Sequence, residues 1–336
     1  MSNNALYYPY INLPQDAWSA RTLLYWDGLA TIVPMDHLYR PEQLSQFMRG
    51  LLSEGLVKQV VPGVDLYACP GFSDHFIEYL EARHRSVNFK TLTPQPLRYT
   101  RIHAEKLNSI TDYLVEHELA SQVDYTWYNV REDVARDFMF YLAVTLGSLD
   151  HIDAVPVTDG WALPGRSPSP STIRRSPHVR KAREVVLEHL LPTPVEGFSV
   201  QQLAQFKHRY GHLLPRFRLA VEQHCIQMAG VTCAEERLER TRLFIGDCQE
   251  QIKEIGSAMK PSFGRIICTS LIPMIASGLS YSGEDGLQGK AVAALGIIPV
   301  AFEVVSQIRA ARGAHLRQPL AYVAHARQFT AFKRDL

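Results

Sequence analysis

The chain has 336 residues, 46% of them hydrophobic and 21% charged, with a net charge of +1 at neutral pH. This length exceeds what one hydrophobic core usually serves, so we expect two domains. The near-zero charge excludes nucleic-acid binding driven by the chain's overall charge. Five cysteines without a C-x-x-C pair are typical neither of a disulfide framework nor of a zinc ribbon, and they indicate a reducing compartment. Since the N-terminus also lacks a secretory signal, we expect a cytoplasmic protein.

The first 62 residues alternate between strand-like and helix-like segments. Asp16 can cap the first helix, and Pro41 stands at a favoured first position of the second. This alternation with short links is typical of parallel strands joined by crossover helices. We therefore predict an α/β domain over residues 1–155 that begins βαβαβ and has a mostly parallel sheet. The expected strands are Leu6–Ile11, Leu29–Val33 and Leu56–Val61.

The pattern is less regular after residue 62. Apolar residues at helical spacing predict further helices, and runs rich in β-branched and aromatic residues predict further strands. The expected helices are Ser73–His84, Glu105–Ala120 and Arg131–Leu149, and the expected strands are Val87–Leu92 and Val123–Val130.

Polar side chains follow the first three predicted strands. Ligands of open α/β sheets bind beyond the carboxyl ends of the strands, so carboxylates converging there could hold a divalent metal or perform acid–base chemistry. The alternative is that the aspartates are helix caps and turn residues and the histidine is solvated. Neither G-x-G-x-x-G nor G-x-x-x-x-G-K-[ST] is present, so a standard dinucleotide or P-loop site is not expected. The candidate catalytic residues are Asp16, Asp36, His37 and Asp65, with Asn12 nearby.

Two more polar groups lie in the first half. Acids at the start of a helix favour the helix dipole, so we interpret the acidic start of the helix over Arg131–Leu149 as a solvated first turn. The Arg83–Arg85 run and the pair Arg101 and His103 could contact phosphates, although short basic runs are usually surface. The residues of the helix start are Glu132, Asp133, Arg136 and Asp137.

The stretch Trp161–Arg183 separates two dissimilar halves. It contains four prolines, four serines and six basic residues without an acid, a composition that sustains neither a helix nor a central strand. Residues 1–160 carry 12 Lys and Arg against 20 Asp and Glu, whereas residues 161–336 carry 23 against 14. We predict a basic linker or strap over residues 156–183. Its candidate contacts to a partner or to nucleic acid are Arg174, Arg175, Arg180, Lys181 and Arg183.

We predict a helical domain over residues 184–336. Apolar residues at alternating spacings of three and four indicate a long antiparallel hairpin over residues 199–259, which Pro215 must kink or divide. His208 and His212 lie four residues apart but lack a third ligand, so we predict no metal site and no cofactor. We predict a second, Gly/Ala-rich apolar hairpin over residues 263–305. Its runs are shorter than a bilayer span, and we interpret it as buried, with membrane insertion as the alternative.

Two stretches resemble an uncharacterised bacterial family, a domain of unknown function found in scattered genomes and prophage-like islands. They are LYYPYINLPQDAW…LLYWDGLATIVP at the N-terminus and LEHLLPTPVEGFSVQQLAQFKHRYGHLLPRFRLAV in the second half. The matching positions are aromatic and apolar, and the family contributes no catalytic residues. The resemblance implies a bacterial cytoplasmic protein with an accessory or phage-defence role.

Three hypotheses for function follow. The leading one is a non-enzymatic interaction or sensor subunit, plausibly in antiviral defence, that acts through a protein partner or as a homo-oligomer. It depends on the lack of a catalytic motif, the coiled-coil-like hairpin and the opposed charges of the halves. The alternatives are a metal-dependent hydrolase or nuclease that uses the carboxylates at the strand ends, and a membrane-active effector that uses residues 263–305.

Overall fold

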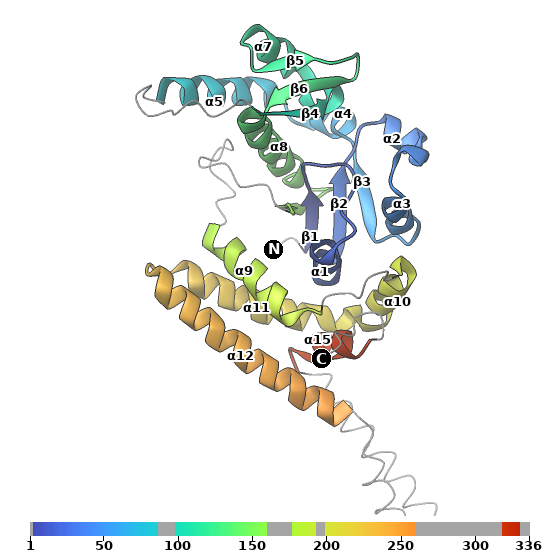
Figure 1. Ribbon diagram of the computed structural model, residues 1–336, viewed down its shortest axis with the longest axis vertical. Coiled ribbons are helices and arrows are strands. Elements are labelled where there is room, and N and C mark those ends of the chain that lie inside the picture. Colours follow the sequence, from blue (N-terminus) through green and yellow to red (C-terminus); the bar gives the residue numbers. More distant parts are fainter. Residues whose placement is uncertain (1–2, 87–97, 160–176, 193–198, 260–317, 330–336) are drawn as a thin grey trace, which may run out of the picture. The chain divides into compact units, whose positions relative to one another are not determined.

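The computed structural model describes residues 3–86, 98–159, 177–192, 199–259 and 318–329 (Figure 1). The chain divides into two compact units. We call residues 1–176 together with 193–208 the α/β unit, and residues 177–192 together with 209–336 the helical unit. The predicted fold class is confirmed, because a parallel sheet with interleaved helices precedes a helical region.

A four-stranded parallel sheet in the order β3-β2-β1-β7 forms the centre of the α/β unit (Figure 1). Strand β1 has neighbours on both sides and pairs in parallel with β2 and with β7. Its residues Ala5, Leu6 and Tyr7 are fully buried, as expected for an inner parallel strand covered on both faces. The strands are β1 (Asn4–Tyr7), β2 (Gly28–Ile32), β3 (Val57–Val60) and β7 (Ala154–Val157).

The connections between these strands follow local capping rules. Asp16 caps α1 (Ala17–Tyr25) by accepting the Ser19 N–H at 2.9 Å, and Ser45 caps α3 (Gln46–Ser53) through the Met48 N–H. Gly55 follows α3 with φ of 67°, a conformation that glycine adopts without strain. Between β2 and α3 lie the short helix α2 (Asp36–Tyr39) and the 3-10 turn η1 (Pro41–Gln43).

A second, antiparallel sheet in the order β4-β6-β5 lies in the same unit. It comprises β4 (Tyr99–His103), β5 (Ala120–Gln122) and β6 (Trp127–Arg131). The prediction of one helix over Glu105–Ala120 is wrong, because Asn108 adopts φ of 52° and ends the first helical turn. The segment instead forms α6 (Ala104–Leu107), η3 (Asn108–Ile110) and α7 (Thr111–Glu116). The prediction of one strand over Val123–Val130 is also wrong, since β5 ends before it and β6 covers only its second half.

Both sheets share one hydrophobic core. The buried cluster joins Leu6 and Ile32 of the parallel sheet to Ile102 and Val130 of the antiparallel sheet. An aromatic group from α5 (Phe72–Ser86) and α8 (Glu132–Gly147) belongs to the same core. Its members are Phe72, Phe76, Phe138 and Tyr141. The chain reaches α5 from β3 through α4 (Pro62–Asp65) and η2 (Leu66–Ala68), and the predicted strand Val87–Leu92 lies outside the described residues.

The second half is helical where the structure describes it. Pro215 stands in the first turn of α11 (Leu214–Ala229), after the 3-10 turn η4 (Gly211–Leu213), so the proline divides the predicted helix. The preceding helix α10 (Val200–Tyr210) spans the limit between the two units, and its Lys207 ammonium donates to the Trp26 carbonyl within the α/β unit. The other helices are α9 (Pro177–Leu190), α12 (Ala234–Met259) and α15 (Ala321–Gln328).

Parts of the predicted linker have regular structure. Strand β7 includes residues 156 and 157, and α9 includes residues 177–183. Residues 160–176 and the predicted apolar hairpin over residues 263–305 lie outside the described residues. Within the described part of the chain, no helix is both long enough and apolar enough to cross a bilayer.

Gly147, the last residue of α8, allows the close approach of β7. A Cβ at this position would collide with the backbone carbonyl oxygen of Ala154. We expect Gly147→Ala to destabilise the protein by about 2 kcal/mol, because neither backbone can move without disturbing the packing. Equilibrium unfolding in urea measures the effect.

Gly246, in the middle of α12, provides the control. No atom lies within 4 Å of a Cβ built there. Gly246→Ala should therefore raise stability by about 0.5–1 kcal/mol through helix propensity alone. Equal effects of the two substitutions would contradict the predicted clash at Gly147.

Candidate functional site

A pocket of about 370 Å³ lies where the chain leaves β1, at the carboxyl end of the parallel sheet. Three parts of the α/β unit form its wall: the segment after β1, the paired strands β4 and β6, and the helices α6 and α8. This position is the usual ligand site of open α/β sheets. The lining residues are Pro9, Tyr10, Ile11, Asn12, Thr100, Arg101, Ile102, His103, Lys106, Trp127 and Met139.

Lys106 of α6 is a buried basic group in this wall. Its side chain is 3% exposed, and its Nζ donates a hydrogen bond of 3.1 Å to the carbonyl oxygen of Pro9, just after β1. Burial lowers the pKa of Lys106 to about 7, although the neighbouring Glu105 carboxylate acts in the opposite direction. The amine therefore changes its charge near neutral pH.

Glu105, the preceding residue, is turned toward the ends of the other two strands. Its Oε2 accepts the Met35 N–H at 2.7 Å, after β2, and its Oε1 accepts the Gly63 N–H at 3.4 Å, after β3. Hydrogen bonds from N–H groups to a carboxylate are stronger than those between neutral groups. Glu105 thus stabilises the loops at the sheet edge and is not among the residues that line the pocket.

Two buried histidines lie near Lys106. His103 Nδ1 accepts the Glu105 N–H at 3.2 Å, so the neutral ring carries its proton on Nε2. Burial lowers the pKa of His103 and of His37, and Lys106 lowers both further, while the carboxylates of Glu105 and Asp36 oppose these shifts. His37 Nδ1 is buried and has no hydrogen-bond partner among the described residues.

Arg101 supplies the exposed positive charge of the pocket. Its guanidinium lies over the Trp127 ring, 5.2 Å from the ring centroid, and pairs with Asp124 at 3.4 Å. Both partners of that ion pair are solvent-exposed, so the pair holds Arg101 only weakly. Among the described residues, the pocket wall thus includes an arginine, a lysine and a histidine but no acid.

Asp16 and Asp65, two of the four predicted catalytic residues, have separate partners. Asp16 is a helix cap, and Asp65 accepts the Val61 N–H and pairs with His151. His37 is coupled electrostatically to Lys106, Asp36 and Glu105. In the described part of the chain, no group of three or more His, Cys, Asp or Glu residues is placed to hold a metal ion. Of the residues predicted at the strand ends, Asn12 lines the pocket.

Sequence reasoning missed Lys106 and Glu105. For the Arg101-x-His103 pair, the sequence favoured ordinary basic surface over a phosphate contact, and both residues line the pocket. The signal that could have indicated Lys106 was its position three residues after His103. Burial of a lysine, however, depends on the tertiary fold and cannot be predicted from the local sequence.

The predicted contact residues of the basic stretch differ in their surroundings. Arg183 is buried and forms two hydrogen bonds of 2.7 Å to the Glu222 carboxylate inside the helical unit. Arg180 lies 3.6 Å from Glu184, while Lys181 is exposed. Arg174 and Arg175 lie outside the described residues.

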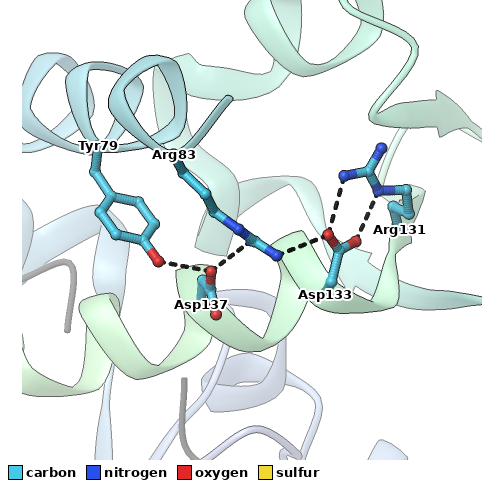
Figure 2. Close-up of polar contacts among 5 residues, drawn as sticks. All are labelled: Tyr79, Arg83, Arg131, Asp133 and Asp137. Atoms are coloured by element: carbon cyan, nitrogen blue, oxygen red, sulfur yellow. Dashed lines mark hydrogen bonds and ion pairs between the residues drawn. The ribbon is translucent and has the colours of Figure 1, made fainter. Parts of the chain in front are cut away.

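A charged network joins α5 to α8 (Figure 2). The Arg83 guanidinium donates to Asp137 at 2.6 Å and to Asp133 at 3.0 Å. Tyr79 donates to Asp137, and Arg131 donates twice to Asp133. Asp137 is buried, so the interpretation of this helix start as a solvated turn is wrong. The reason is that α5 packs over it and brings Arg83 within reach.

The two aspartates of this network titrate differently. Burial raises the pKa of Asp137 more than Tyr79 and Arg83 lower it. Burial also acts to raise the pKa of Asp133, but the hydrogen bonds and charges of Arg131 and Arg83 outweigh it and hold the pKa low. The guanidinium of Arg83 therefore stabilises the negative charge of the buried Asp137 carboxylate.

Removing Arg83 tests this dependence. We expect Arg83→Met to lower the free energy of unfolding by about 2–3 kcal/mol, since it leaves the Asp137 carboxylate buried with Tyr79 as its remaining hydrogen-bond donor among the described residues. The control is Arg240→Met, which removes an exposed ion pair with Glu236 and should cost at most about 0.5 kcal/mol. Urea unfolding at neutral pH measures both. Equal, small losses would show that the network contributes little.

Comparisons with known protein families, with curated proteins and with solved structures find no match to this chain. The resemblance to an uncharacterised bacterial family therefore stays a prediction. The roles of Arg101, His103 and Lys106 rest on the geometry of the pocket alone.

Proposed function

We propose that this protein is a non-enzymatic sensor or interaction subunit whose α/β unit binds a small anionic ligand in the pocket beyond β1. The observation that carries this proposal is the position of Lys106. Its Nζ is buried in the pocket wall and, among the described residues, bonds only to the Pro9 carbonyl. When Lys106 is protonated, its buried charge is costly unless an anion compensates it, and a ligand in the pocket can supply that anion.

The charges around the pocket support an anionic ligand. Arg101 and His103 contribute further donors to the same wall, and the nearest acid, Glu105, is engaged by two backbone N–H groups. A low-dielectric wall strengthens the attraction between such donors and a carboxylate or phosphate. The volume of about 370 Å³ is that of a small-molecule site.

The surface of the helical unit supports a role in protein contacts. Large apolar side chains on α11 and α12 are solvent-exposed among mixed charges. Exposed apolar groups of this kind are frequent at interfaces between proteins. We propose that the helical unit transmits the state of the pocket to a protein partner or to a second copy of the chain, in the bacterial cytoplasm and plausibly in defence against phage. The exposed residues are Leu219, Ile226, Leu238 and Leu243.

Calorimetric titration with inorganic phosphate and with L-lactate tests the anion site. We expect one binding site for at least one of the two anions. Arg101→Met should weaken its affinity about tenfold, because the substitution removes a charge-assisted hydrogen bond at the pocket. The matched control is Arg98→Met, since Arg98 is an exposed arginine nearby that does not line the pocket. No heat of binding, or equal losses in both variants, would refute an anion site here.

Native mass spectrometry of the gently purified protein tests the interaction role. We expect a mass above that of the monomer, and we expect Leu243→Ser to reduce it, since the side chain is 66% exposed on α12. Val64→Ser makes a similar change at an exposed residue of the α/β unit and should leave the assembly intact. A bare monomer in the unmodified protein would count against an interaction subunit.

A further inference from the structure

We propose that Lys106 acts as a nucleophilic amine and binds the carbonyl carbon of a 2-oxo acid as a reversible imine. This inference rests on the proposed function, because it names the ligand class of the same pocket. A 2-oxo acid combines an electrophilic carbonyl with an adjacent carboxylate, and the pocket offers one group for each: Lys106 for the carbonyl and Arg101 for the carboxylate.

The hydrogen bonding of Nζ favours a neutral amine. An ammonium has three N–H donors, of which only one has an acceptor among the described residues, the Pro9 oxygen at 3.1 Å. In a site that is 97% removed from solvent the other two would stay unsatisfied, at considerable cost. A neutral amine can keep the bond to Pro9 and direct its lone pair into the pocket. The surroundings of Nζ thus favour the form of lysine that attacks carbonyls.

The charges around Nζ act in the same direction. Burial lowers the pKa of Lys106 to about 7, and Glu105 is the carboxylate that opposes this shift. His103 and His37 are coupled to Lys106, and protonation of either would further disfavour an ammonium. A substantial part of the protein therefore carries an uncharged amine at neutral pH, whereas an ordinary lysine is almost fully protonated.

The reaction balances without an oxidant or a reductant. The Nζ lone pair forms a bond to the carbonyl carbon, the C=O π electrons move to oxygen, and a proton passes from nitrogen to that oxygen. Expulsion of the hydroxyl as water then leaves a C=N bond, and addition of water reverses each step. His103, in the same wall, is placed to exchange these protons through its imidazole. The product retains the ligand's carboxylate, which Arg101 can hold.

Reductive trapping tests the proposal on the full-length chain. The protein is incubated with pyruvate and sodium cyanoborohydride, and the adducts are located by mass spectrometry of the intact chain and of its peptides. We expect one pyruvate adduct per chain, on Lys106, because its free amine reacts. With a pKa of about 7, the free-amine fraction and therefore the trapping rate should rise about fivefold from pH 6 to pH 7 and level off above about pH 8, whereas the rate at an ordinary lysine keeps rising about tenfold per pH unit. Adducts spread over exposed lysines such as Lys58, or no adduct, would overturn the imine.

Two variants sharpen this test. Lys106→Arg keeps the positive charge but cannot form the imine, so trapping should disappear. Lys58→Met removes an exposed lysine of β3 and should leave the adduct on Lys106 unchanged. If Lys106→Arg fails to fold by circular dichroism, the peptide map of the unmodified protein still decides which lysine reacts.

L-lactate separates failure of this inference from failure of the proposed function. Lactate has the same carboxylate as pyruvate but no carbonyl, so it tests the anion site without the imine. Binding of lactate without a pyruvate adduct would overturn the imine and keep the anion site. An adduct on Lys106 without lactate or phosphate binding would keep the imine and overturn the anion site.

Discussion

Two consecutive residues of α6 hold the chain where three parallel strands end. Glu105 accepts N–H groups after β2 and β3, and Lys106 donates to the carbonyl after β1. Backbone groups at the ends of parallel strands have no partner in the sheet, so side chains must satisfy them when they are buried. This short helix thus fixes the edge of the sheet, and it places an amine in the pocket by the same contacts.

The cost of burying these charges is distributed over the α/β unit. Glu105 and Lys106 are compensated mainly by backbone dipoles, whereas Asp133 and Asp137 are compensated by Arg83 and Arg131 (Figure 2). The second arrangement uses full opposite charges and leaves no group without a strong partner. The first leaves Lys106 with a single acceptor, so the pocket, and not the α5–α8 network, is where a ligand can add the most binding energy.

The sequence predicted that three parallel strands alternate with helices at the start of the chain, because apolar runs, caps and prolines are local signals. It placed the first strand at Leu6–Ile11, whereas β1 covers Asn4–Tyr7. The antiparallel sheet was not predictable in the same way. Its strand β4 consists of the partly polar sequence YTRIH, and its pairing with β6 is long-range. The helix ends after Leu107 because Asn108 adopts a positive φ. The neighbouring residues give no indication of this conformation. Arg101 and His103 line the pocket although the sequence favoured ordinary basic surface for them, while Lys106 acquires its chemistry from burial.

The shared core of the two sheets has a consequence for how the gene can be divided. Ile102 and Val130 complete the same cluster as Leu6 and Ile32, so the antiparallel segment is not an appendage. A fragment that stops before residue 99 would present the apolar side of the parallel sheet to water and would aggregate. Strand β7 adds a second tie, since it brings residues 154–157 beside β1. A recombination event that preserves folding must therefore keep the coding sequence for residues 4–157 together.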